Sequence, residues 1–291
     1  MTGRVLITGA GGQLGSTVAA AFPSAEIVAL PRAALDVSDS GAVEQAVARV
    51  RPDVVLNCAA FTDVDGAEGR PTDALQANAL AVRALARACR ATGATLVHYG
   101  SDFVFNGRGD RPYTEEDEPG PESVYAVSKL LGDWFAVDAP SHYVLRVESL
   151  FGGHRRSTSI DKIAATIRKG DPARVFVDRT VTPSYVEDVA AATASLLSSR
   201  APFGVYHCVN TGVTTWFDLA LEIARVLGLP ADLVPVKVAD VQLKARRPQY
   251  AALSNDKLRR AGIEMPSWQH ALARHLEPLE SLIPNPSSSN P

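Results

Sequence analysis

The stretch VLITGAGGQLG, which spans residues 5–15, decides the fold class of this 291-residue chain. Its apolar start is typical of a short buried strand that ends at Thr8, and Gly9, Gly12 and Gly15 then follow at intervals of three. Glycines between a strand and a helix let backbone N–H groups approach a phosphate, and the start of the helix attracts an anion. An ordinary turn can carry the same glycines, but the first strand of a βαβ unit is the context that a dinucleotide-binding loop requires. We therefore expect Gly9 and Gly12 to lie against the pyrophosphate of a dinucleotide.

Short apolar runs alternate with Ala-rich helical stretches through the first half of the chain. We expect strands over 5–8, 26–30, 53–57, 94–99 and 142–147, and helices over 13–22, 41–50, 71–91 and 123–137. This alternation predicts an α/β fold with a Rossmann-type, doubly wound parallel sheet.

The alternation loosens after residue 151. Further helices are expected over 160–169, 185–198 and 214–228, strands over 174–177 and 204–209, and short elements over 254–261 and 268–275. The predicted organisation is a dinucleotide-binding domain over 1–150 and a smaller, mainly substrate-binding region over 151–282, some segments of which return to the sheet. The polar tail over 283–291 is expected to be disordered.

Composition excludes several classes of protein. The chain is 46% hydrophobic and 21% charged, with 29 basic and 32 acidic side chains and a net charge of −3. This balance leaves no basic excess for a nucleic acid, and no apolar run approaches the roughly 18 residues of a membrane span. The three cysteines, Cys58, Cys89 and Cys208, lack the spacing of a disulfide framework or a zinc site. We expect a soluble, cytoplasmic protein without nucleic-acid or membrane partners.

The end of the second strand bears on the choice of dinucleotide. A carboxylate there would bond the ribose hydroxyls of NAD, but the strand ends in Leu30-Pro31-Arg32. Arg32 could pair with the 2′-phosphate of NADP, or it could be a solvated surface arginine. Asp36 is the next candidate for the adenine amino group, although it could equally cap the helix that begins near Ser40.

Tyr125 and Lys129, in YAVSK, lie one helical turn apart and therefore share a face of the expected helix. An ammonium beside a phenol stabilises the phenolate and should draw the pKa of Tyr125 down toward the working pH. Such a pair alone is also common on helix surfaces. Ser101, however, follows a strand whose carboxyl end faces the ligand crevice. A serine, a tyrosine and a lysine beside a dinucleotide are typical of hydride transfer to a carbonyl, with Tyr125 as the proton donor.

Several longer stretches resemble the dTDP-4-dehydrorhamnose reductase family, within the extended short-chain dehydrogenase/reductase superfamily. They are TGAGGQLG, RPDVVLNCAAFTDVDGAE (51–68), HYGSDFVFNG (98–107), YAVSKLLGD (125–133), GVYHCVNTGVTTWFDLA (204–220) and ARRPQYAAL (245–253). The resemblance covers nearly the whole chain. It implies reduction of the 4-keto group of a nucleotide-linked 6-deoxy sugar, dTDP-4-dehydro-L-rhamnose in that family, by NADPH or alternatively NADH.

The resemblance also implies roles for particular residues. Those at the cofactor are Gly12, Gln13 and Leu14 at the pyrophosphate, Asp36 and Val37 at the adenine, and Ala60, Phe61, Thr62 and Tyr99 at its flanks. Those at the sugar are Ser101, Asp102, Tyr125 and Arg247. Lys129 would bond the nicotinamide ribose and tune Tyr125. Apart from the resemblance, Asp63, Asp65 and Glu68 could be a solvated acidic loop.

The chain departs from the family pattern at several positions. Ser149 stands where the family has a tryptophan that packs on the sugar, which puts the identity of the sugar in doubt. Gly100-Ser101-Asp102 replaces an S-T-D triplet, and residues 177–190 differ from the family's glycine-bearing version, which puts the wall of the sugar site in doubt. Thr17 stands where some members have an acidic magnesium ligand at a dimer contact, so no metal is predicted.

Two other functions compete with a reductase. An epimerase or dehydratase of the same superfamily would retain its NAD, and a regulatory subunit would bind a dinucleotide without catalysis. The complete set of Ser101, Tyr125 and Lys129 argues against a subunit without catalysis. The sequence does not distinguish a monomer from a homodimer.

Overall fold

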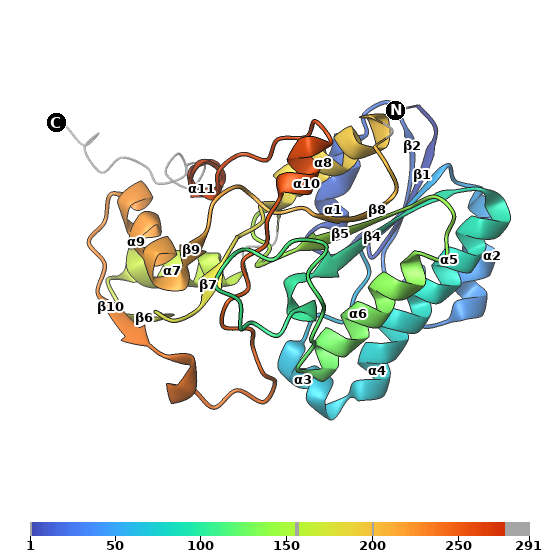
Figure 1. Ribbon diagram of the computed structural model, residues 1–291. Coiled ribbons are helices and arrows are strands. Elements are labelled where there is room, and N and C mark those ends of the chain that lie inside the picture. Colours follow the sequence, from blue (N-terminus) through green and yellow to red (C-terminus); the bar gives the residue numbers. More distant parts are fainter. Residues whose placement is uncertain (1, 155–156, 200, 277–291) are drawn as a thin grey trace.

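Six parallel strands form the central sheet of the computed structural model, which describes residues 2–154, 157–199 and 201–276 (Figure 1). Their order in the sheet is β2-β1-β3-β4-β5-β8. The strands are β1 (Arg4–Thr8), β2 (Glu26–Leu30), β3 (Val54–Asn57), β4 (Thr95–Ser101), β5 (His142–Val147) and β8 (Gly204–His207). The chain reverses direction across the sheet between β1 and β3, and the carboxyl ends of strands at such a point form a ligand crevice. The predicted Rossmann-type, doubly wound fold is confirmed.

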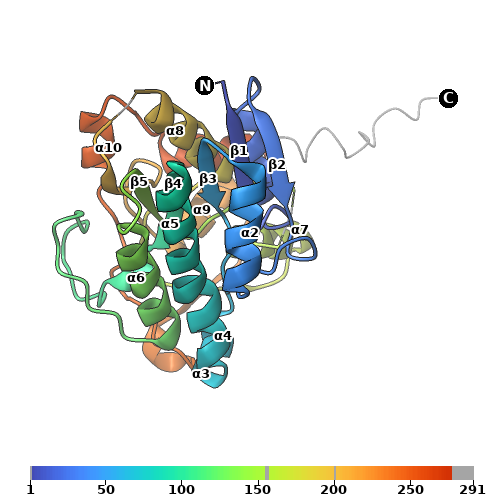
Figure 2. The same cartoon turned by 90° about the vertical axis from the view of Figure 1, so that its right-hand side faces the viewer.

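Side chains along each strand alternate between two helical layers. On β1, Val5 and Ile7 belong to one core, with α1 (Gly15–Val18) and α8 (Val186–Ser199). Leu6 belongs to the other core, with α2 (Ser40–Val50), α5 (Ala81–Thr92) and α6 (Val124–Ala136). Figure 2 shows α2, α5 and α6 side by side on one face of the sheet. Because helices cover both faces, the strands are apolar on both sides, as their sequences indicated.

Two expected helices are interrupted. The stretch predicted over 13–22 is α1 followed by a 3₁₀ turn (Ala19–Ala21). The stretch predicted over 71–91 is α4 (Pro71–Leu75), a π-helical turn (Gln76–Leu80) and α5. A further short helix, α3 (Val64–Gly69), precedes α4.

The second half of the chain builds a smaller region beside the sheet (Figure 1). Its elements are α7 (Ser159–Lys169), β6 (Ala173–Phe176), β7 (Thr180–Val181), β9 (Thr214–Thr215), α9 (Trp216–Leu227), β10 (Leu233–Val236) and α11 (Trp268–Leu276), with a 3₁₀ turn over Val238–Asp240. α10 (Asp256–Arg260) instead packs against the sheet beside β8. The core of this region includes Phe151, Ile160, Trp216 and Trp268. β8 pairs with β5 and α8 packs on the sheet, so the two halves interleave. The predicted tail over 283–291 lies outside the described residues.

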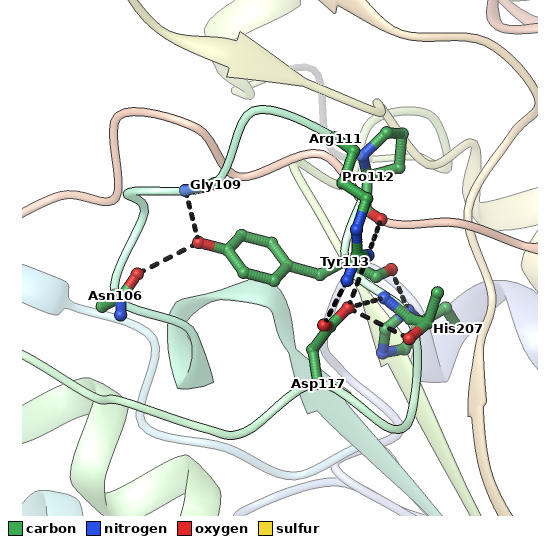
Figure 3. Close-up of polar contacts among 8 residues, drawn as sticks. Asn106, Gly109, Arg111, Pro112, Tyr113, Asp117 and His207 are labelled. Atoms are coloured by element: carbon green, nitrogen blue, oxygen red, sulfur yellow. Dashed lines mark hydrogen bonds and ion pairs between the residues drawn. The ribbon is translucent and has the colours of Figure 1, made fainter.

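A loop over 106–120 joins the carboxyl end of β4 to α6, and its own side chains hold it together (Figure 3). The Tyr113 hydroxyl donates to Asn106 Oδ1 (3.1 Å) and accepts from the Gly109 N–H (2.9 Å). His207, on β8, contacts the Tyr113 carbonyl through Nδ1 at 3.0 Å. This scaffold leads the chain directly to the start of α6.

The segment over 245–254 lies between this loop and β7. Its Tyr250 N–H donates to the Gly107 carbonyl (3.0 Å), and its Ala251 N–H donates to the Thr180 carbonyl (2.8 Å). Gly107 has φ +75°, and a Cβ there would lie 2.5 Å from the Pro248 Cα, so the close approach of the two backbones requires glycine. Across the described residues, no helix is long and apolar enough to cross a bilayer.

Candidate functional site

A cavity of about 1050 Å³ opens at the carboxyl ends of β1, β3 and β4. Among the residues that line it are those predicted for the cofactor: Gly9, Gly12, Gln13, Leu14, Arg32, Asp36, Val37, Ala60, Phe61, Thr62 and Tyr99. The same cavity is lined by Ser101, Asp102, Tyr125 and Lys129. Arg247 is the predicted site residue that does not line it. Residues far apart in the sequence thus meet in one space of the size that a dinucleotide and a second ligand need.

The glycine loop after β1 is shaped by close backbone contacts. Gly9 has φ +65°, and a Cβ on it would lie 2.6 Å from the Ala59 nitrogen in the loop after β3. A Cβ on Gly15 would lie 2.3 Å from the Gly9 carbonyl oxygen. Side chains at these positions would fill the cradle, so the loop fits a pyrophosphate held by backbone N–H groups. Since α1 has only four residues, the loop amides contribute more than a helix dipole does.

At the rim of the cavity, Arg32 and Asp36 form an ion pair with 3.6 Å between Nη2 and Oδ2. The Arg32 side chain is 88% exposed, which leaves its guanidinium free to turn toward a phosphate. Asp36 accepts hydrogen bonds from the Ser38 hydroxyl and N–H, which lower the pKa of its carboxyl. The cap of α2 is Asp39, which accepts from the Ala42 N–H (2.9 Å). Asp36 therefore does not cap that helix.

Ser101, Tyr125 and Lys129 converge from β4 and α6. Lys129 is 3% exposed, and its Nζ donates to the Tyr99 carbonyl at 2.6 Å. The Ser101 hydroxyl donates to Asp102 Oδ1 (3.0 Å) and hydrogen-bonds with Tyr125. Ser101 ends β4, and Tyr125 and Lys129 lie on α6, so sheet and helix together fix the three groups.

The pKa of Tyr125 moves in the direction opposite to the one expected from its spacing to Lys129. It is raised to about 12, first by burial and then by the charge of Asp102, while the hydrogen bond with Ser101 acts to lower it. Burial also lowers the pKa of Lys129 to about 8. In this site Tyr125 therefore stays protonated at neutral pH, as a proton donor must.

Asn78, which the sequence reading missed, fixes the wall of the cavity. Its amide accepts from the Phe61 N–H (2.8 Å), donates to the Phe61 carbonyl (3.0 Å) and donates to the Ser128 hydroxyl (2.9 Å). Asn78 is 1% exposed and lies in the π-helical turn. π-helical turns are common at functional sites, but helical periodicity in the sequence does not reveal them. One amide thus joins the loop after β3 to the helix that carries Tyr125.

The acidic loop after β3 is tied to the rest of the molecule. Asp63 caps α3 by accepting from the Gly66 N–H (2.9 Å). Glu68 accepts from the Val124 N–H (2.9 Å) at the start of α6, next to the Ser123 cap. Asp65 forms a two-pronged ion pair with Arg247 (3.1 and 2.9 Å). Arg247 therefore faces a carboxylate rather than the cavity, and it joins the segment over 245–254 to the sheet region.

A buried pair of charged side chains, Glu148 and Arg179, lies behind the cavity wall that contains Ser149, and the sequence did not reveal it. Glu148 is 1% exposed directly after β5, and Arg179 approaches it from the turn between β6 and β7. The next residue, Ser149, lines the cavity with φ +44°. Ser149 and Arg179 occupy two of the stretches that depart from the family pattern, so the departures gather on one wall.

Several predicted roles concern residues away from this cavity. His98 and His207 are buried, and burial is the main cause that lowers the pKa of each. The Thr17 hydroxyl donates to the Gln13 carbonyl (3.1 Å). Within the described part of the chain, no group of three or more His, Cys, Asp or Glu side chains could hold a metal ion.

Comparison with known proteins identifies the family. The family model described as "RmlD substrate binding domain" matches residues 3–281. A dTDP-4-dehydrorhamnose reductase of Streptomyces griseus is 38% identical over 279 residues, which cover 92% of this chain and 91% of the relative. The chain belongs to the dTDP-4-dehydrorhamnose reductase family.

Two more proteins that this chain resembles bear on its cofactor and substrate. A solved dTDP-4-dehydrorhamnose reductase of Bacillus anthracis, in complex with NADP, superposes with a TM-score of 0.91 at 30% identity, covering 96% of this chain and 100% of that one. A probable dTDP-4,6-dihydroxy-2-methyloxan-3-one 4-ketoreductase of Streptomyces antibioticus is 35% identical over 92% of this chain and 93% of its own length. The resemblance drawn from the sequence is confirmed at the level of the family.

Proposed function

We propose that this protein uses NADPH to reduce the 4-keto group of a dTDP-linked 6-deoxy sugar, with dTDP-4-dehydro-L-rhamnose as the first substrate to test. The observation that carries the proposal is the convergence of Ser101, Tyr125 and Lys129 in the cavity that also contains the glycine loop. The names of the relatives support the substrate class, and the NADP complex of the Bacillus anthracis relative supports the cofactor.

Each residue has a role that follows from its place. Gly9, Gly12 and Gln13 would receive the pyrophosphate, and Lys129 would bond the nicotinamide ribose. Bound NADPH supplies the hydride. The Ser101 hydroxyl would polarise the keto oxygen, and Tyr125 would donate the proton. The raised pKa of Tyr125 keeps that proton in place until charge develops on the keto oxygen.

The exact sugar is a separate part of the proposal. Ser149 offers no aromatic platform on the cavity wall, and the Streptomyces antibioticus relative is named for a different 4-keto sugar. We propose that Arg247 helps to hold the substrate diphosphate from the segment over 245–254, which requires it to share or leave Asp65.

The test is a panel of dTDP-4-keto-6-deoxy sugars incubated with the protein and NADPH. NADPH absorbance measures turnover, and NMR of the product gives the configuration at the reduced carbon. We expect NADPH to be consumed mole for mole with the sugar. Conversion of a sugar without net consumption of NADPH would instead indicate an epimerase or dehydratase, and binding without conversion would indicate a regulatory subunit.

A further inference from the structure

Asp102 and Glu148 place two buried carboxyl groups side by side next to the candidate proton donor. β4 and β5 are neighbours in the sheet, and Ser101 pairs with Val147 at their carboxyl ends. Asp102 and Glu148 are the next residues of the two strands, so they leave the sheet together. Their side chains are 4% and 1% exposed, respectively. Asp102 also lines the cavity, whereas Glu148 lies behind it.

Hydrogen bonds satisfy only one of the two Glu148 carboxyl oxygens. Oε2 accepts from the Thr182 N–H (2.6 Å) and the Thr182 hydroxyl (2.5 Å). Oε1 is buried and has no hydrogen-bond partner among the described residues. A buried, ionised oxygen without a donor is costly, and a bound proton removes that cost.

Arg179 is the cation that both carboxyl groups face. Its Nε donates to the Pro248 carbonyl at 3.3 Å. The other charged or titratable groups that interact with this trio are Tyr125 of α6, Asp178 beside Arg179, and Arg247 and Tyr250 of the segment over 245–254. Two carboxylates that share one guanidinium in a desolvated site favour the retention of a proton. Burial is the main cause that raises the pKa of Asp102 to about 7 and that of Glu148 to about 8.

We propose that Asp102 and Glu148 hold one proton between them at neutral pH, and that this proton, passed through the Ser101 hydroxyl, restores Tyr125 after each turnover. The relay rests on the proposed reductase function. When Tyr125 has given its proton to the sugar oxygen, its phenolate takes the Ser101 proton and Ser101 takes the proton of Asp102. The pair then regains a proton from water in the cavity. Transfer from a carboxyl group to a phenolate runs downhill, since the pKa of Asp102 is about 7 and that of Tyr125 about 12.

Glu148 acts through Asp102 and is therefore a positioning residue, which a pH profile can reveal. Loss of the shared proton should lower kcat on the alkaline side of the wild-type profile. In Glu148→Gln the repulsion on Asp102 disappears, so this alkaline limb should move down by roughly one pH unit, and kcat at pH values well above the limb should fall about tenfold. In Arg179→Gln the pair loses its cation and holds the proton more tightly, so the limb should move up.

Glu115→Gln is the matched control, because Glu115 is a partly buried glutamate whose pKa is also raised and which also accepts from a backbone N–H, that of His207. Its profile should match that of the wild type. A purely structural effect of Glu148 or Arg179 would lower kcat at every pH without moving the limb. The relay would be overturned if the alkaline limb stayed at the wild-type pH in either variant, or if it moved in the same direction in both.

Infrared difference spectroscopy tests the shared proton without any substrate. The spectrum of the wild type minus that of Glu148→Gln at pH 7 should contain the C=O stretching band of a protonated carboxyl group. Absence of that band would overturn the shared proton, even in an active enzyme. A protein that shows the band but reduces no keto sugar would keep the shared proton and overturn both the proposed function and the relay.

Discussion

The surroundings of the Tyr125 hydroxyl raise its pKa and keep it protonated at neutral pH. The spacing to Lys129 predicts the opposite, because one helical turn brings an ammonium onto the same face. Spacing does not reveal that the Lys129 Nζ donates to the Tyr99 carbonyl, or that Asp102 adds a negative charge beside the phenol. The place of Tyr125 in the cavity could be predicted from the sequence, but the pKa of its hydroxyl depends on burial and on neighbours from other strands.

Tyr125→Phe should retain NADPH binding and lose about 10²- to 10⁴-fold in kcat, because the variant keeps the ring and loses the proton. Binding is measured by fluorescence titration and turnover by NADPH absorbance. Tyr206→Phe is the control, since the Tyr206 hydroxyl donates to the Pro202 carbonyl away from the cavity. Substantial turnover by Tyr125→Phe would remove Tyr125 from the proton-donor role.

Arg32→Ala should raise the KM for NADPH more than the KM for NADH. The side chain is 88% exposed at the cavity rim, and only NADPH carries the 2′-phosphate that it can pair with. Arg87→Ala, which removes an exposed arginine of α5, should change neither KM. Equal changes for the two cofactors would show that Arg32 is only a surface residue.

The junction between α6 and the π-helical turn joins the helix that carries Tyr125 to the cavity wall. A Cβ on Gly132 would lie 2.1 Å from the Asn78 carbonyl oxygen, so the two helices meet backbone to backbone. Gly132→Ala should therefore destabilise the fold by roughly 1–3 kcal/mol, measured by urea unfolding.

Gly69→Ala provides the comparison for Gly132→Ala. Gly69 ends α3, and a Cβ there meets nothing within 4 Å. The free energy of unfolding of this variant should therefore rise by about 0.4–1 kcal/mol. If both alanine variants unfold at the same urea concentration, the close packing of α6 on the π-helical turn contributes nothing to stability.

The bounds of strands could be predicted from the sequence more accurately than the interruptions within helices. The bounds expected over 26–30 and 142–147 are those of β2 and β5, because covered parallel strands read as short apolar runs between turns. The helix expected over 71–91 contains a π-helical turn. The spacing of its apolar residues does not reveal this turn, because a single wider turn leaves the pattern nearly unchanged. The four-residue α1 ends early in a 3₁₀ turn that the alanines at 19–21 do not signal.

The candidate site divides in the same way. Residues at the carboxyl ends of strands, such as Gly9 directly after β1 and Ser101 at the end of β4, could be located because parallel strands end at one edge of the sheet. Glu148 and Arg179 could not, since their meeting depends on how the turn between β6 and β7 folds back onto β5. Arg247 resembles a family substrate residue in sequence, but its partner here is Asp65.

For the whole molecule, the buried carboxyl pair predicts an unusual dependence of stability on pH. The pKa of Glu148 is about 8, against an ordinary value of 4.5, so between these values the folded chain binds more protons than the unfolded one. The free energy of unfolding must then fall as the pH rises, and it levels off above the raised pKa. Asp102, with a pKa of about 7, acts in the same direction.

The clearest window lies between pH 6.5 and 8. Below it, the lowered pKa values of the buried His98 and His207 add stability as the pH rises, and above it the lowered pKa of Lys129 does the same. Within the window, urea unfolding should show a decline of about 1 kcal/mol per pH unit in the wild type and a smaller one in Glu148→Gln. A stability that rises across this window in the wild type would contradict the assignment.

The segment over 245–254 has a consequence for how the protein is made. During synthesis, the strands and loops that surround the dinucleotide are all in place by the end of β5, roughly halfway along the chain. The backbone that seals the loop after β4 and β7 emerges about a hundred residues later. A growing chain can therefore complete the glycine loop and the strands beside it well before the segment over 245–254 is available to join the loop after β4 to β7.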